Sequence, residues 1–176
     1  MNIEQIFKLD RKSKEIIDGK NIDKLNLEFN LWKGERIKDT FGNKPVIYFN
    51  NKPLFAELVI IEIFKINGIN AVWVDNFRKK FRIELPENNN GIELPIEIKN
   101  KFDLIVKHNK TRNGCWDIIT WNDKNEITFF ELKLKGRDEI RDSQIKWLNT
   151  CIEIGYSLNN FTIIEWKKII NKYKYE

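Results

Sequence analysis

Trp116–Trp121 (WDIITW) and Ile127–Leu134 (ITFFELKL) are apolar segments rich in β-branched and aromatic residues, and a short polar break separates them. This composition predicts two strands joined as a β-hairpin. The strands carry three charged residues, Asp117, Glu131 and Lys133. Because a charge buried in a sheet costs free energy unless it is paired or bound to an ion, these three residues require a chemical explanation.

The register of the hairpin decides whether the three charges share a face. Strand side chains alternate, so Glu131 and Lys133 point the same way. A three-residue loop at 123–125 places Asp117 directly opposite Glu131, whereas a two-residue loop would turn Asp117 to the other face. Asn125 tolerates the left-handed conformation that a three-residue hairpin loop requires. We therefore predict the three-residue loop, with Asp117 opposite Glu131.

Two carboxylates that converge with a lysine form a hard, oxygen-lined site suited to Mg²⁺, with Mn²⁺ as a substitute. Such an ion can bind a scissile phosphate, lower the pKa of a bound water and stabilise the leaving oxygen. The lysine ammonium could orient that water or neutralise charge that develops on the phosphate. A cross-strand salt bridge at a sheet edge is the competing interpretation, and spacing alone does not separate the two.

The rest of the chain alternates strand-like and helix-like segments, which predicts an α/β fold. The helix that begins close to Pro53 and ends at Gly68 is apolar on nearly all sides and should be buried. The other expected helices cover residues 3–17, 96–107, 142–154 and 167–175, and the other expected strands cover residues 46–49, 70–74 and 161–166.

The chain has 176 residues and 41% hydrophobic content, which suits one globular domain with its own core. Within it we expect residues 46–176 to form the principal domain and residues 1–45 to form a peripheral segment. Lys and Arg outnumber Asp and Glu by 31 to 26, and the resulting net charge of +5 is consistent with a polyanionic partner without requiring one.

Cysteine usage and hydropathy indicate a cytoplasmic, soluble protein. Cys115 and Cys151 show neither the spacing of a zinc or redox motif nor the density of a secreted disulfide scaffold. No apolar run approaches the ~20 residues that span a bilayer, and the first residues lack a signal sequence, so no membrane partner is expected. His108 lies in a polar stretch, which argues against hydrolase chemistry centred on histidine.

The buried helix offers two acids for the hairpin site, Glu57 and Glu62. Glu57 lies on an apolar stripe at helical spacing, whereas Glu62 has Lys65 three residues on and can form a surface ion pair. We choose Glu57. The competing interpretation is an acid in the first helical turn that interacts favourably with the helix dipole.

The order of a helix acid, Asp117, the ExK element Glu131–Lys133 and the helix segment Ser143–Leu148 (SQIKWL) resembles the PD-(D/E)XK nuclease superfamily, and most closely its VRR-NUC branch. The resemblance covers residues 53–166. It implies a restriction-endonuclease-like mixed central β-sheet flanked by α-helices. It also implies roles at five positions: Glu57, Asp117 and Glu131 as metal-side acids, Lys133 as the residue that positions or activates water, and Gln144 as an auxiliary.

The chain departs from the family pattern at two points. Trp116 stands where the proline of the motif would be, and a basic segment at 76–82 followed by a long stretch at 84–114 separates the helix from the hairpin. These departures do not change the assignment of the site residues, but they leave the substrate undetermined.

A basic cluster follows the ExK strand and is expected to flank the metal site, where it could contact phosphates: Lys135, Arg137, Arg141 and Lys146. A solvated charged loop is the alternative, because acids are interspersed among these residues. In the 76–82 segment, Phe77 and Phe81 could stack on bases, but we expect them to anchor the loop to the core. Trp147 is expected in the core.

These features together predict a Mg²⁺-dependent nuclease that hydrolyses phosphodiester bonds, with DNA as the expected nucleic acid. The alternative is a nucleic-acid-binding or protein-interaction module that keeps the nuclease fold without catalysis. Metal titration separates the two, because a salt-bridge cluster should not respond to EDTA. By analogy with small members of the superfamily, a homodimer or a partner protein is expected.

Overall fold

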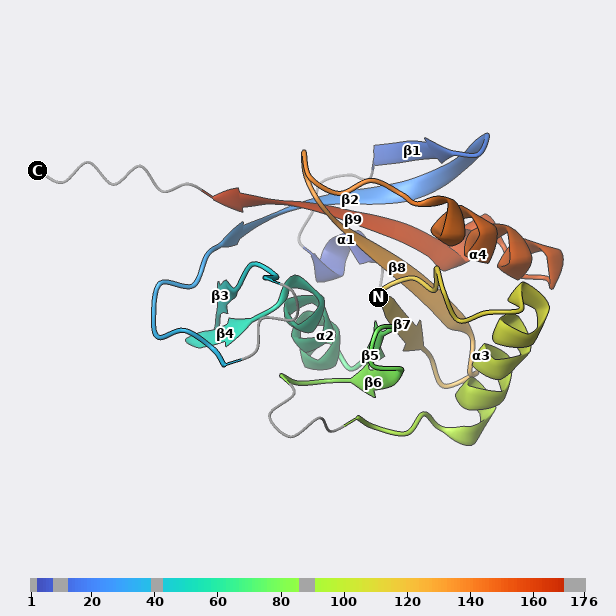
Figure 1. Cartoon of the computed structure of the whole chain (residues 1–176), viewed down its shortest axis with the longest axis horizontal. Helices are drawn as coiled ribbons and strands as arrows, with labels where there is room; N and C mark the ends of the chain where they lie inside the picture. Colours follow the sequence, from blue (N-terminus) through green and yellow to red (C-terminus); the bar gives the residue numbers. More distant parts are fainter. Residues whose placement is uncertain (1–2, 8–12, 39–42, 86–90, 170–176) are drawn as a thin grey trace, which may run out of the picture.

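The computed structural model describes residues 3–7, 13–38, 43–85 and 91–169, and its main feature is one seven-stranded sheet in the order β1-β2-β9-β8-β7-β5-β6 (Figure 1). A separate two-stranded hairpin consists of β3 and β4. In chain order, the elements are α1 (Ile3–Ile6), β1 (Ser13–Ile17), β2 (Lys20–Asn30), β3 (Ile47–Phe49), β4 (Lys52–Leu54), α2 (Ala56–Ile66), β5 (Asn70–Asp75), β6 (Lys80–Arg82), α3 (Ile96–Asn109), β7 (Ile118–Trp121), β8 (Ile127–Leu134), α4 (Asp142–Glu153), a short 3₁₀ turn (Leu158–Asn160) and β9 (Phe161–Ile169).

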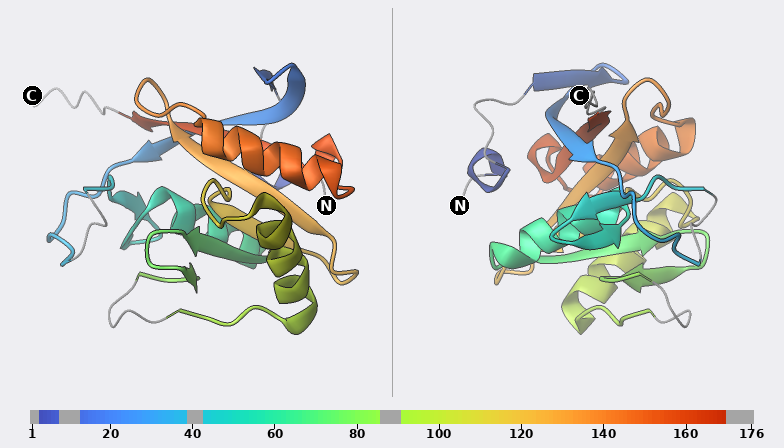
Figure 2. Two further views of the ribbon diagram at one scale, coloured as in Figure 1. Left: turned by 45° about the vertical axis from the view of Figure 1, so that its right-hand side comes forward. Right: turned by 90° about the vertical axis from the view of Figure 1, so that its left-hand side faces the viewer.

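The sheet is mixed and has a hydrophobic core on each face. β8 pairs antiparallel with β7 and parallel with β9. Helix α2 packs on one face, against residues such as Phe130 and Leu132 of β8. Helices α3 and α4 lie side by side on the other face, where they pack against Phe129 and Phe161 (Figure 2). The prediction of an α/β fold with a mixed central sheet between helices is confirmed.

The hairpin has the predicted register. Ile118 pairs with Phe130 and Trp121 pairs with Ile127, so the next pair outward joins Asp117 to Glu131. The loop is the three-residue one at 123–125, since the backbone N–H of Asn122 donates to Glu126 O at 3.3 Å across it. Asn125 has φ of 57°, the left-handed conformation that favours Asn at this position.

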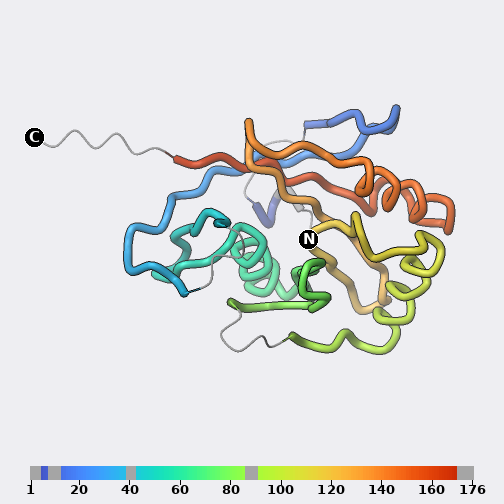
Figure 3. Tube along the Cα trace, viewed as in Figure 1, coloured from blue at the N-terminus to red at the C-terminus, as the bar shows by residue number. Residues whose placement is uncertain are grey.

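Strand β2 corrects the expectation that residues 1–45 are peripheral. It runs parallel to β9 over eight paired positions, as the adjacent blue and red traces show (Figure 3). Ile22 and Leu25 of this strand are fully buried. The strand was missed because its buried residues divide between the two faces of the sheet, Ile22 on one and Leu25 on the other, with charged side chains between them, so no apolar alternation is evident.

Both ends of the chain depart from their predicted helices. The helix expected over 3–17 is limited to α1, and β1 occupies the end of that range. The helix expected over 167–175 is wrong at 167–169, where β9 continues, and the rest of it lies outside the described residues.

The inner elements agree with prediction, apart from one boundary. The strand at 70–74 and the helices at 96–107 and 142–154 appear as β5, α3 and α4. Helix α2 begins at Ala56 and not at Pro53, because Pro53 belongs to β4. No helix in the described part of the chain combines the length and the hydropathy needed to cross a membrane.

Candidate metal centre

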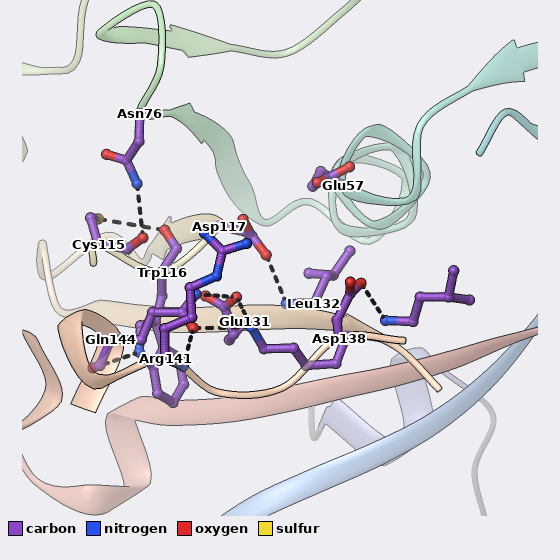
Figure 4. Close-up of polar contacts among 12 residues, drawn as sticks. Glu57, Asn76, Cys115, Trp116, Asp117, Glu131, Leu132, Asp138, Arg141 and Gln144 are labelled. Atoms are coloured by element: carbon purple, nitrogen blue, oxygen red, sulfur yellow. Dashed lines mark hydrogen bonds and ion pairs between the residues drawn. The ribbon is translucent and has the colours of Figure 1, made fainter. Parts of the chain in front are cut away.

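The two carboxylates of the hairpin meet where β7 begins (Figure 4). Asp117 directly precedes β7, and its Oδ2 accepts a hydrogen bond at 2.9 Å from the backbone N–H of Leu132 in β8. Glu131 is 2% exposed, and burial together with the negative charge of Asp117 raises the pKa of its carboxyl well above the ordinary value. The charge of Lys133 opposes this shift only in part. The carboxyl of Glu131 is therefore harder to ionise than an ordinary glutamate.

Gln144 and Lys133 hold one side of the Glu131 carboxylate. Lys133 Nζ lies 2.9 Å from Glu131 Oε1 and donates to Gln144 Oε1 at 3.0 Å. Gln144 Nε2 donates to Glu131 Oε1 at 2.5 Å, and its Oε1 also accepts the backbone N–H of Arg141. Gln144, the predicted auxiliary residue, thus lies in the first turn of α4 and hydrogen-bonds both Glu131 and Lys133.

The other oxygen of Glu131 has no such partner. Glu131 Oε2 is buried, and it accepts no hydrogen bond from any residue in the ranges that the structure describes. A buried anionic oxygen without a donor is costly, and a cation is the partner that would satisfy it.

Glu57 is linked to the other two acids by a lysine, Lys44, which sequence analysis did not single out. Glu57 lies in the first turn of α2, is 4% exposed and forms an ion pair with Lys44. Burial raises the pKa of Glu57, the positive charge of Lys44 lowers it, and the negative charge of Asp117 raises it further. Burial alone would lower the pKa of Lys44, but attraction to Glu57, Asp117 and Glu131 raises it to about 12. The Lys44 ammonium is therefore the cation that these three acids share.

The oxygen ligands suit Mg²⁺, but the site has two carboxylates and not the three that were predicted. The described ranges contain no group of three or more His, Cys, Asp or Glu side chains arranged to hold a metal, so Glu57 does not converge with Asp117 and Glu131. Two carboxylates are nevertheless sufficient for Mg²⁺, which keeps several of its waters when it binds a protein. The residues that would hold the ion are Asp117 and Glu131, because Glu131 has the unpaired oxygen.

The acids open into a cleft of about 950 Å³. Arg137 and Arg141 line it, as predicted for residues that contact phosphates. Lys135 points elsewhere and lies 3.5 Å from Glu165. Lys146 borders a different hollow on α4. The structure therefore brings two of the four predicted basic residues to the centre and leaves the other two outside it.

The aromatic residues of the 76–82 segment separate into two kinds. Phe81 packs edge-on against Phe102, with ring centroids 5.2 Å apart, so the prediction that it anchors the loop is confirmed. The same prediction is wrong for Phe77, which is 90% exposed and lines the cleft. Trp147 is fully buried, as expected.

Gly114 sets the position of α4 relative to the hairpin. Its φ of +83° is in the left-handed region, and a Cβ there would lie 1.9 Å from the carbonyl oxygen of Ser143. The loop before Asp117 therefore contacts the first turn of α4 directly, and this turn carries Gln144.

Lys44 and Gly114 were both missed because their partners are distant in sequence. Lys44 is one of 31 basic residues, and no periodic pattern distinguishes it from the others. Gly114 could have been singled out as a turn residue, but its contact with Ser143 depends on tertiary packing.

Comparison of the chain with protein-family models, with curated proteins and with solved structures finds no match. The chemistry of the centre therefore has to be inferred from its own residues. They comprise two adjacent carboxylates, a lysine and a glutamine fixed beside them, and two arginines along the cleft.

Proposed function

We propose that this protein is a Mg²⁺-dependent nuclease of the PD-(D/E)XK type that hydrolyses phosphodiester bonds in DNA. The observation that carries the proposal is the unpaired, buried Oε2 of Glu131 beside Asp117. A divalent cation held between Asp117 and Glu131 would give this oxygen a partner and would balance the second carboxylate. The basic lining of the cleft supports a polyanionic substrate.

Each residue then has a role that its contacts support. Asp117 and Glu131 would hold the metal, which when bound would supply a more acidic water and positive charge beside the scissile phosphate. Lys133, fixed by Glu131 and Gln144, orients the attacking water and stabilises the negative charge of the transition state.

The residues around this core position the substrate and the catalytic lysine. Gln144 keeps the Lys133 ammonium in place from α4. Arg137 and Arg141 bind the flanking phosphates along the cleft, where guanidinium groups form charge-assisted hydrogen bonds.

The test is a cleavage panel of linear, circular, flapped and four-way DNA with Mg²⁺ and with EDTA. Asp117→Asn and Lys133→Met should each reduce cleavage by about a thousandfold or more, because each removes a group that acts in the transition state. Circular dichroism should show the fold unchanged. Matched controls are Asp103→Asn and Lys99→Met, which alter an exposed ion pair on α3 and should cut normally. Undiminished metal-dependent cleavage by Asp117→Asn would refute the proposal.

A second function is favoured by Lys44, whose ammonium forms an ion pair with Glu57 and is attracted by Asp117 and Glu131. In this alternative the protein binds nucleic acid or a protein partner without catalysis, and the acids with Lys44 form a structural charge cluster. Mn²⁺ titration decides between them. A catalytic centre binds Mn²⁺ and loses it in Asp117→Asn, whereas a structural cluster ignores both Mn²⁺ and EDTA.

A further inference from the structure

We infer that the turn between β5 and β6 is a binding site for an unpaired nucleobase, with the ring of Phe77 as the stacking surface. The inference rests on the proposed function and names the substrate class of the same cleft: nucleic acid with a single-stranded stretch beside the scissile phosphate. Four observations on this turn carry it.

The first observation is the exposure of the ring. Phe77 is 90% exposed. Single exposed apolar side chains are common on protein surfaces, so exposure alone decides little. Among the described residues, however, the only other strongly exposed aromatic ring is that of Tyr48, which stacks on Trp32 at 6.0 Å. Phe77 stacks on no aromatic ring within the described ranges, and it lines the cleft that contains the acids.

The second observation is that the turn is held firmly in place. Asp75, at its start, accepts hydrogen bonds from Arg82 Nε at 2.8 Å and from the backbone N–H of Arg78 at 3.1 Å. Asn76 Nδ2 donates to Cys115 O at 3.0 Å, which ties the turn to the chain just before Asp117 (Figure 4). A rigid turn that presents an apolar ring to water loses little conformational entropy when a ligand covers it.

The third observation is the distance to the acids. The backbone N–H of Val74 donates to Asp117 O at 2.8 Å. Phe77 is three residues further along, and three residues span at most about 11 Å. Phe77, Asp117 and Glu131 line the same cleft, so one strand of nucleic acid could reach both the ring and the metal-side acids.

The fourth observation is the charge beside the ring. The Arg78 guanidinium lies 5.7 Å from the Phe77 ring centroid. Lys79 and Lys80 follow on the exposed side of the turn. An aromatic ring next to cationic groups is the arrangement by which proteins bind single-stranded nucleic acid, because every base offers a π-face while the cations attract the phosphates. Bases inside a duplex are already stacked and cannot offer that face.

The experiment measures binding without cleavage. Fluorescence anisotropy with the Asp117→Asn protein in EDTA compares a labelled single-stranded oligothymidylate with a blunt duplex. Adding Phe77→Ala should weaken binding of the single strand by about tenfold and leave the duplex unchanged, since stacking is lost. Phe77→Trp should retain the affinity. Leu104→Ala removes an apolar side chain of 48% exposure from α3 and is the matched control, with no change expected.

Two results would overturn the inference: equal binding of the single strand by Phe77→Ala and its parent, or an equal loss for single strand and duplex. The second would make Phe77 a general contact. The two proposals fail separately. If the cleavage panel shows no Mg²⁺-dependent cutting but Phe77→Ala loses the single strand alone, the nuclease assignment falls and the base site stands. If cutting occurs but Phe77→Ala binds as its parent does, the base site falls alone.

Discussion

Buried acids occur at two places on the sheet, and their partners differ. Asp75 on β5 is 3% exposed, and the Arg82 guanidinium, itself 1% exposed, binds it at 2.8 Å. Glu131 on β8 is equally buried, but one of its oxygens lacks a partner and Asp117 adds a second negative charge beside it. The first pair has its charges balanced and its hydrogen bonds made, whereas the second has one buried oxygen unpaired and two acids beside one another. The balanced pair suits a structural role, and the unbalanced pair is the one that the proposed function uses.

The largest effect is expected from breaking the balanced pair. Arg82→Met leaves Asp75 buried without its main cation and should lower the free energy of unfolding by about 3–5 kcal/mol in urea titrations. Arg78→Met is the control: Arg78 Nη1 lies 3.9 Å from Asp75 and its side chain is 28% exposed, so the loss should stay below about 1 kcal/mol.

A double variant tests the interpretation of that pair. Asp75→Leu with Arg82→Met replaces both charges by apolar groups and should recover most of the stability. If it is as unstable as Arg82→Met alone, the pair does more than balance charge, and the contrast with the metal centre weakens.

An intermediate effect is expected at Lys44. Lys44→Met removes the cation that the three acids share, so Mn²⁺ should bind on the order of tenfold more tightly by isothermal titration, since a competing positive charge is gone. The metal-free protein should be less stable, because Glu57 loses its partner. Lys52→Met, an exposed lysine of β4, is the control. Weaker Mn²⁺ binding in Lys44→Met would show that Lys44 supports the metal site.

The smallest effect concerns Glu131 itself. Its carboxyl has a raised pKa, so between the ordinary and the raised pKa the folded protein holds more protons than the unfolded chain. Stability must then fall as pH rises through that window. Glu131→Gln removes the charge and should raise the melting temperature by a few degrees in EDTA, with the gain increasing toward alkaline pH.

The same variant has a second readout and a control. Mn²⁺ should stabilise the parent protein more than Glu131→Gln, because the amide lacks the negative charge that attracts a divalent cation. Glu165→Gln on the adjacent strand removes an acid whose lysine partners are partly exposed, so it should change little. A lower melting temperature for Glu131→Gln would mean that the Glu131 charge stabilises the fold.

Interactions between residues close together in the chain could be predicted from the sequence. The placement of Asp117 opposite Glu131 follows from the length of one turn, and Asn125 indicated that length, so both were predicted correctly. The position of Gln144 followed from a helix start nearby in the chain.

Interactions between distant segments gave no such signal. Lys44 interacts electrostatically with Glu131 across 87 residues of chain, and its environment could not be inferred from a polar loop. A short separation was not sufficient either: Arg82 lies seven residues after its buried partner Asp75, across a turn whose geometry the sequence did not specify. The exposure of Phe77 likewise depends on how that turn is held.

The parallel pairing of β2 with β9 has a kinetic consequence. In the sheet order, β9 separates the β1–β2 hairpin from β8, although β2 is made early in synthesis and β9 some 130 residues later. The strand that carries Glu131 and Lys133 therefore has an open edge until β9 arrives. Pairings between such remote segments form slowly, and an unpaired edge is a template for wrong partners. The nascent chain should therefore depend on late closure of its sheet, and refolding should be slow and prone to aggregation at high protein concentration.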